Sequence, residues 1–209
     1  MDDFSFLSGL FGILFGLIVA EVATKLADAI DLHHRRPIGV LTPLLACVVL
    51  MDAAGFWIWF WSLRLIVTVQ WHTVFIGLIV AVIYFLAASL VFPRGQADWS
   101  SLDQHYWSRK RLVIGGLLLV DGTFFAWEFS RVRPAWNDWW LYFYILPYFG
   151  GFLGLLVSRS RLTDILLLLI LVASLISSGL DLFPGSQWGN QLGINILSQA
   201  STSGPAVSR

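Results

Sequence analysis

WHTVFIGLIVAVIYFLAASLVF, residues 71–92, contains no Asp, Glu, Lys or Arg and is followed at once by Pro93. A helix that spans the hydrocarbon core of a bilayer needs about 20 mostly apolar residues. The stretch has that length and composition, so it predicts a transmembrane helix.

Five further stretches have the same character. They run from about Phe6 to Ala29, Val40 to Leu63, Leu112 to Phe129, Trp139 to Val157 and Leu162 to Leu182. Short connections join them, apart from one polar loop expected from Pro93 to Lys110. The sequence therefore predicts an all-α integral membrane protein, a six-transmembrane-helix bundle.

The composition argues against a soluble domain, a nucleic-acid-binding protein and a disulfide-rich fold. Hydrophobic residues make up 57% and charged residues 12% of the chain, whereas a soluble domain carries about 25% charged residues. The net charge is zero, so no overall field attracts nucleic acid. Cys47 is the single cysteine, which excludes a disulfide framework within one chain. We expect lipid to solvate much of the surface.

Nine of the 13 Lys and Arg residues fall on one face of the predicted bundle. Because the Lys- and Arg-rich loops of a membrane protein stay in the cytoplasm, both termini are expected outside, with the protein in a bacterial plasma (inner) membrane. Residues 1–184 form the predicted transmembrane domain, and the polar residues 185–209 a disordered tail.

Short motifs recur along the chain. GLIVA occurs at residues 16–20 and again at 77–81, and VLMD at 49–52 is followed by the similar LLVD at 118–121. These matches predict repeated helical hairpins at about 6–66 and 71–130, with a diverged third copy at 139–183. Parallel repeats of this kind occur in transporters.

Two stretches, GLIVAEVATKL at 16–26 and LDQHYW at 102–107 before RKR at 109–111, resemble a group of small bacterial multi-pass membrane proteins with six helices. The resemblance implies that fold and that location. It implies no activity, cofactor or site residue.

Acidic residues inside the predicted helices are the candidate functional groups. A charge at the helix centre costs about 2.5–3.5 kcal/mol or more, so such residues face the protein interior. At about 1.5 Å of rise per residue, Glu21, Asp52 and Asp121 lie at a similar depth. If the three carboxyls cluster, at least one should hold a proton. With Lys25, one turn after Glu21, they form a predicted ion or proton pathway.

Other readings of these residues stay open. Asp52 and Asp121 could instead be structural, each hydrogen-bonding a neighbouring helix. Tyr144 and Tyr148, beside Pro147 in the fifth helix, are candidate pore-lining residues, and the proline marks that helix as the one expected to kink or break.

Basic residues on the cytoplasmic face are expected to bind lipid headgroups and set topology. They are His33, His34, Arg35, Arg36, Arg109, Lys110 and Arg111. A sharper reading joins two Asp-x-His motifs into a metal site, since Asp and His suit divalent metals. Its ligands would be Asp31, His33, Asp103 and His105.

Three functions follow from these patterns. The first is a proton or small-cation channel or transporter that uses the intramembrane carboxylates. The alternative is a non-transporting membrane subunit or sensor that binds a partner protein through its basic loops. The third is a small lipid-modifying enzyme that uses the Asp-x-His loops. We expect a lipid bilayer and a homo-oligomer as partners, with no cofactor and no nucleic acid; no nucleotide-binding or hydrolase motif is present.

Overall fold

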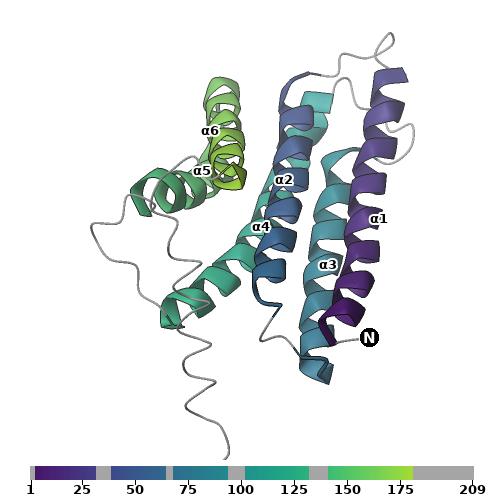
Figure 1. The fold of residues 1–209 in the computed structure, drawn as a ribbon. Coiled ribbons are helices and arrows are strands. Elements are labelled where there is room, and N and C mark those ends of the chain that lie inside the picture. Colours follow the sequence, from purple (N-terminus) through teal and green to yellow (C-terminus); the bar gives the residue numbers. More distant parts are fainter. Residues whose placement is uncertain (1–2, 32–38, 65–67, 94–101, 132–140, 181–209) are drawn as a thin grey trace, which may run out of the picture.

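The computed structural model describes residues 3–31, 39–64, 68–93, 102–131 and 141–180, and every regular element within them is helical (Figure 1). Six α-helices and one π-helical turn are formed. They are α1 (Asp3–Asp31), α2 (Leu41–Ser62), α3 (Trp71–Val91), α4 (Leu102–Arg131), η1 (Leu141–Ile145), α5 (Leu146–Val157) and α6 (Arg161–Gly179).

Five helices are long and apolar enough to cross a membrane. The spans are Phe4–Asp31, Leu41–Trp61, Trp71–Val91, Leu102–Ser130 and Arg161–Gly179, and Tyr142–Val157 is a shorter apolar helix. The predicted number of six helices is therefore confirmed, with the fifth below full spanning length. The predicted start of that helix and the 185–209 tail lie outside the described residues.

The predicted polar loop before the fourth helix is wrong in part. Helix α4 begins at Leu102, ten residues earlier than expected from the apolar run alone. Its first turns are polar, yet His105, Tyr106 and Lys110 are buried against the rest of the protein. Tertiary packing therefore extends the helix beyond the segment that hydropathy marks.

The first four helices run alternately up and down, beginning from the N-terminus at the foot of α1 (Figure 1). Helix α2 contacts α1, α3, α4 and α6, and it is the most buried of the five spans. Helices α5 and α6 pack on each other, and α6 closes against α2. A polar residue in the middle of α2 is consequently enclosed by protein.

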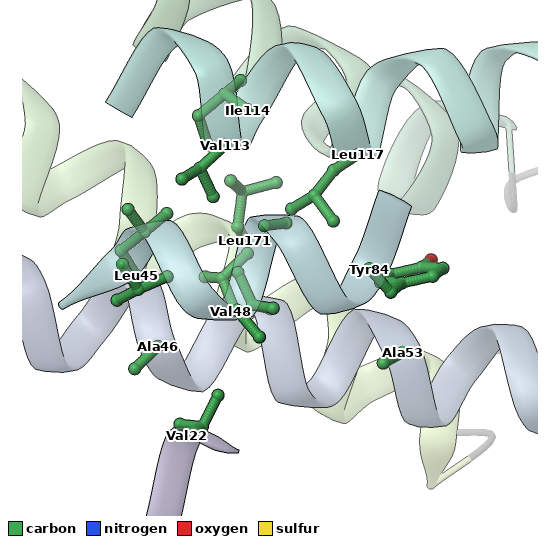
Figure 2. Packing of buried hydrophobic residues seen from close by; sticks show 14 of the residues in the cluster. Val22, Leu45, Ala46, Val48, Ala53, Tyr84, Val113, Ile114, Leu117 and Leu171 are labelled. Atoms are coloured by element: carbon green, nitrogen blue, oxygen red, sulfur yellow. The ribbon is translucent and has the colours of Figure 1, made fainter. Parts of the chain in front are cut away.

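Branched apolar side chains of α2, α4 and α6 fill the core, as Figure 2 shows for Leu45, Val48, Val113, Ile114, Leu117 and Leu171. Their surroundings include buried alanines on α2 and α3, which let the helix backbones approach. Large apolar residues also remain on the outside, among them Ile13, Ile58, Leu119, Leu162 and Leu166. Such an outer face is suited to contact with lipid chains.

The fifth helix changes geometry at Leu146, one residue before Pro147. Proline has no N–H group to donate within a helix, and π-helical turns occur mostly as single insertions, frequently at functional sites. The irregularity lies where the proline predicted it. It precedes Tyr148, which is buried.

Gly77 allows α1 and α3 to pack closely. A Cβ atom there would overlap the ring of Phe11, which is itself buried against Phe60 with ring centroids 5.3 Å apart. We expect Gly77→Ala to lower the free energy of unfolding by about 1–3 kcal/mol, because the overpacked ring must move. Thermal unfolding in lipid nanodiscs measures the change.

Gly16 provides the matched control, since it occupies the corresponding position of the repeated GLIVA motif and nothing lies within 4 Å of a Cβ atom built there. Gly16→Ala should leave stability unchanged or slightly higher. Equal losses in the two variants would contradict the packing argument.

Candidate functional site

Two aspartates and two tyrosines from four different helices meet inside the bundle. Asp52 lies on α2, Tyr84 on α3, Asp121 on α4 and Tyr148 on α5. Their side chains are 3%, 0%, 7% and 3% exposed, respectively. We call these four residues the Asp–Tyr cluster.

The hydrogen-bond contacts of the Asp–Tyr cluster form a closed cycle. The Tyr84 hydroxyl lies 3.0 Å from Asp52 Oδ2 and 3.5 Å from Asp121 Oδ1. The Tyr148 hydroxyl lies 2.9 Å from Asp121 Oδ2 and is also hydrogen-bonded to Asp52 Oδ1. Each carboxyl therefore contacts both hydroxyls, and each hydroxyl contacts both carboxyls.

Aromatic packing holds the two phenols in place. The ring of Tyr84 packs against Phe15 and Phe56, each with centroids 5.9 Å away. The ring of Tyr148 stacks on Tyr144 at 5.5 Å and meets the edge of Phe152 at 4.9 Å. Because apolar contacts surround both rings, the hydroxyls can reach the carboxyls with little freedom to point elsewhere.

The sequence prediction of a three-carboxyl cluster needs a correction. Asp52 and Asp121 do meet, but the Glu21 carboxylate is 26% exposed and lies 3.6 Å from Lys25 Nζ on the same helix. This pair is spaced four residues apart, the usual geometry of a salt bridge along a helix surface. We therefore place Glu21 and Lys25 outside the Asp–Tyr cluster.

Tyr84 was not predicted from the sequence, although it is the single tyrosine of the stretch 71–92, which has no Asp, Glu, Lys or Arg. Its hydroxyl at mid-span is a polar group that lipid cannot satisfy, which is the signal that could have found it. Tyr148, predicted to line a pore, hydrogen-bonds both aspartates. The ring of Tyr144, the other predicted pore-lining residue, stacks on the ring of Tyr148.

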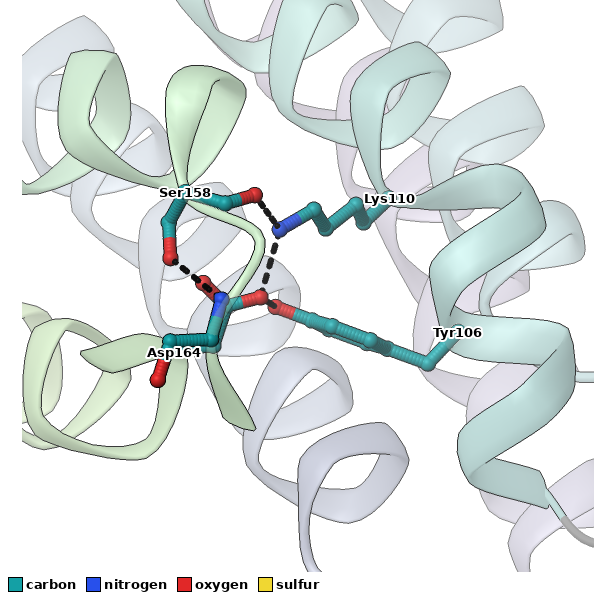
Figure 3. A network of polar contacts seen from close by, with 5 residues as sticks. Tyr106, Lys110, Ser158 and Asp164 are labelled. Carbon is teal, nitrogen blue, oxygen red and sulfur yellow. Dashed lines mark hydrogen bonds and ion pairs between the residues drawn. The ribbon is translucent and has the colours of Figure 1, made fainter. Parts of the chain in front are cut away.

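A second cluster of polar residues joins α4 to the start of α6, as Figure 3 shows. Lys110 Nζ donates to Asp164 Oδ2 at 2.6 Å and to the Ser158 carbonyl at 2.8 Å. The Tyr106 hydroxyl donates to the same Asp164 oxygen at 2.8 Å. We call these four residues the Lys110 cluster.

The Lys110 cluster overturns the headgroup role predicted for Lys110. That side chain is 2% exposed, its partner Asp164 is fully buried, and the ammonium lies 4.2 Å from the centre of the Trp107 ring. A buried, paired lysine cannot reach lipid headgroups. Arg109 and Arg111, by contrast, are exposed, and residues 33–36 lie outside the described part of the chain.

The predicted metal ligands have other partners where the structure describes them. Asp103 Oδ2 pairs with Arg161 at 3.0 Å, and His105 Nε2 lies 2.9 Å from the Leu90 carbonyl. Asp31 is exposed, and His33 is not among the described residues. Within residues 3–31, 39–64, 68–93, 102–131 and 141–180, no group of three or more His, Cys, Asp or Glu could hold a metal ion.

Helix α4 carries a line of ionisable residues on one face. Lys110, Asp121 and Glu128 are separated by eleven and seven residues, close to whole numbers of helical turns. All three are buried, and Glu128 accepts a hydrogen bond of 2.5 Å from the indole of Trp59 on α2.

Comparisons of the chain with protein-family models, with curated proteins and with solved structures find no match.

Proposed function

We propose that the protein carries protons or small cations across a bacterial plasma membrane, with Asp52 and Asp121 as the residues that bind them. The observation that carries this proposal is the meeting of two buried carboxyls from different helices. Carboxyls in the hydrocarbon region are costly and mark ion or proton pathways in membrane proteins.

The depth of the Asp–Tyr cluster supports the proposal. Asp52 follows the start of α2 by eleven residues, and Asp121 precedes the end of α4 by ten. At 1.5 Å per residue both lie roughly 15 Å from a helix end, near the middle of a bilayer about 30 Å thick. Transporters place their sites near this level.

The repeated hairpins fit the same proposal. Asp52 and Asp121 end the two similar motifs VLMD and LLVD, and each contacts the same two hydroxyls. A duplicated hairpin would bring two copies of one residue together in this way. For orientation, the exposed Arg109, Arg111 and Arg161 support a cytoplasmic location for the end of the bundle that holds the Lys110 cluster.

One observation favours the alternative of a non-transporting membrane subunit that binds a partner protein through its basic loops. Every member of the Asp–Tyr cluster is buried and hydrogen-bonded to two others, as a purely structural clamp would be. The described residues offer no comparable support for the lipid-modifying enzyme.

A flux assay separates these functions. Purified protein is reconstituted into proteoliposomes that contain a pH dye. An outward potassium gradient and valinomycin create an inside-negative membrane potential, which drives proton uptake. We expect uptake by the wild type, and at least about a tenfold loss in Asp52→Asn and in Asp121→Asn, because an amide cannot exchange a proton at these positions. Vesicles that contain a sodium- or potassium-sensitive dye and no valinomycin test cation transport.

Glu21→Gln is the matched control, since it neutralises a carboxyl of a membrane helix outside the Asp–Tyr cluster. Its flux should equal that of the wild type. Circular dichroism and monodisperse elution confirm folding of each variant. Wild-type vesicles that move protons, sodium and potassium no faster than empty vesicles would contradict transport and favour the subunit.

A further inference from the structure

The Asp–Tyr cluster has more hydrogen-bond contacts than its two tyrosines have protons. Four oxygen–oxygen contacts close the cycle, and each contact needs one hydrogen between its two oxygens. A phenol supplies one, and an ionised carboxylate supplies none. With both aspartates ionised, two of the four contacts would place lone pairs against each other.

One proton on each carboxyl satisfies all four contacts between hydroxyls and carboxyls, and it leaves Asp52 and Asp121, whose carboxyls also interact directly with each other, without charge. Tyr84 then donates to Asp52 Oδ2, and Asp52 Oδ1 donates to the Tyr148 hydroxyl. Tyr148 donates to Asp121 Oδ2, and Asp121 Oδ1 donates back to Tyr84. In this arrangement each hydroxyl donates one hydrogen bond and accepts one, and each carboxylic acid also donates one and accepts one.

The neutral arrangement also fits the charges nearby. The ion pairs of the described residues involve Glu21, Asp103 and Asp164, so none of them offsets a charge on Asp52 or Asp121. The titratable group stacked against Tyr148 is Tyr144, itself a neutral phenol. Two adjacent unpaired carboxylates at these buried positions would be costly, whereas two hydrogen-bonded carboxylic acids would not.

The four contacts differ in length, and the difference assigns roles to the two tyrosines. Both contacts of the Tyr148 hydroxyl are short, with Asp121 Oδ2 at 2.9 Å. The contact between Tyr84 and Asp121 Oδ1 is 3.5 Å, the outer limit of a hydrogen bond. The cycle is therefore weakest at Asp121 Oδ1, and Asp121 is also the most exposed of the four residues.

We propose that the species carried is the proton, and that Tyr148 relays it between two carboxyls that are both protonated at rest. This inference rests on the proposed function. Tyr84, with its longer contact, acts as a positioning residue.

The relay step conserves protons and charge. Asp121 first transfers the proton on Oδ1 to a water molecule. The water becomes hydronium, and Asp121 becomes a carboxylate. Tyr148 then transfers its hydroxyl proton to Asp121 Oδ2, and Asp52 Oδ1 transfers its own to the Tyr148 oxygen. The negative charge has moved from Asp121 to Asp52, which takes up a proton from water entering on the other side.

Infrared spectroscopy of the protein in lipid nanodiscs tests the resting state without any transport. The wild type at neutral pH should show the carbonyl stretch of protonated carboxylic acids, shifted by exchange into deuterium oxide. Part of this signal should be lost in Asp52→Asn and another part in Asp121→Asn. Tyr148→Phe should keep the whole carbonyl band and shift its frequency, because the substitution removes one hydrogen bond from each of the two acids.

Flux measurements test the relay. Tyr148→Phe should reduce proton uptake at least about tenfold, the usual size of an acid–base contribution, while Tyr84→Phe reduces it less. Tyr142→Phe, an exposed tyrosine of the preceding turn, is the matched control and should be unchanged. Equal losses in Tyr84→Phe and Tyr148→Phe would overturn the assigned roles.

The two assays separate the failure of this inference from that of the proposed function. Flux without any carboxylic acid band, or flux that follows sodium instead of the proton gradient, overturns the inference and leaves ion transport standing. A clear band without flux of any ion overturns both the relay and the transport function.

Discussion

Lys110→Met is expected to lower the free energy of unfolding by about 3–5 kcal/mol, the cost of leaving one partner of a buried ion pair without the other. Asp164 is fully buried, and the Lys110 ammonium lies 2.6 Å from its Oδ2. Methionine matches the shape of the lysine stem and removes the charge together with its hydrogen bonds to Asp164 and to the Ser158 carbonyl. The Tyr106 hydroxyl remains as a donor to Asp164, but a neutral group cannot offset a buried carboxylate.

Two further variants isolate the ion pair in thermal unfolding in nanodiscs. Lys110→Met combined with Asp164→Leu should recover much of the lost stability, because no unpaired charge remains. Lys25→Met is the matched control: its partner Glu21 is partly exposed at 3.6 Å, so the loss should be below about 1 kcal/mol. Similar losses in Lys25→Met and Lys110→Met would show that burial of the Lys110 cluster is not what stabilises it.

The helices could be predicted because the signal for a membrane span is local. Length and apolar composition identify residues 71–92 without knowledge of any other segment. The start of α4 could not be found in this way, because its first turns are polar. They are helical and buried because Tyr106 and Lys110 meet Asp164 from α6, a contact that exists only in the folded chain.

The Asp–Tyr cluster was predicted in part for a similar reason. Counting residues gives the depth of a side chain in the membrane but not the direction in which it points around its helix. Depth correctly brought Asp52 and Asp121 to one level, and it brought Glu21 there as well, although Glu21 lies beside Lys25 instead. Asp164 escaped notice because an acid in the first turn of a helix has an ordinary role there.

A layer of buried apolar side chains separates the Asp–Tyr cluster from the Lys110 cluster. On the shared face of α4, roughly 16 Å lies between residues 110 and 121 at 1.5 Å per residue. Val113, Ile114 and Leu117 fill this interval, and all three are fully buried (Figure 2). Protons cannot cross closely packed alkyl groups without water or hydroxyls, so this layer should limit the rate of any flux through the Asp–Tyr cluster.

Leu117→Asn is therefore expected to raise the proton flux of reconstituted vesicles about tenfold, which requires only about 1.4 kcal/mol off the barrier. The amide offers hydrogen bonds to water in the layer that is otherwise apolar, one turn from Asp121 along the same face. The same pH-dye assay measures the change, and circular dichroism confirms that the variant folds.

The informative control places Leu117→Asn in a chain that already carries Asp52→Asn and Asp121→Asn. If protons pass through the Asp–Tyr cluster, the added asparagine cannot restore flux in this background, because the carboxyls that accept the proton are gone. A leak of equal size in both backgrounds would mean that water bypasses the aspartates. In that case the added proton flux would result from a general packing defect. Asp52 and Asp121 would then serve only to hydrogen-bond neighbouring helices.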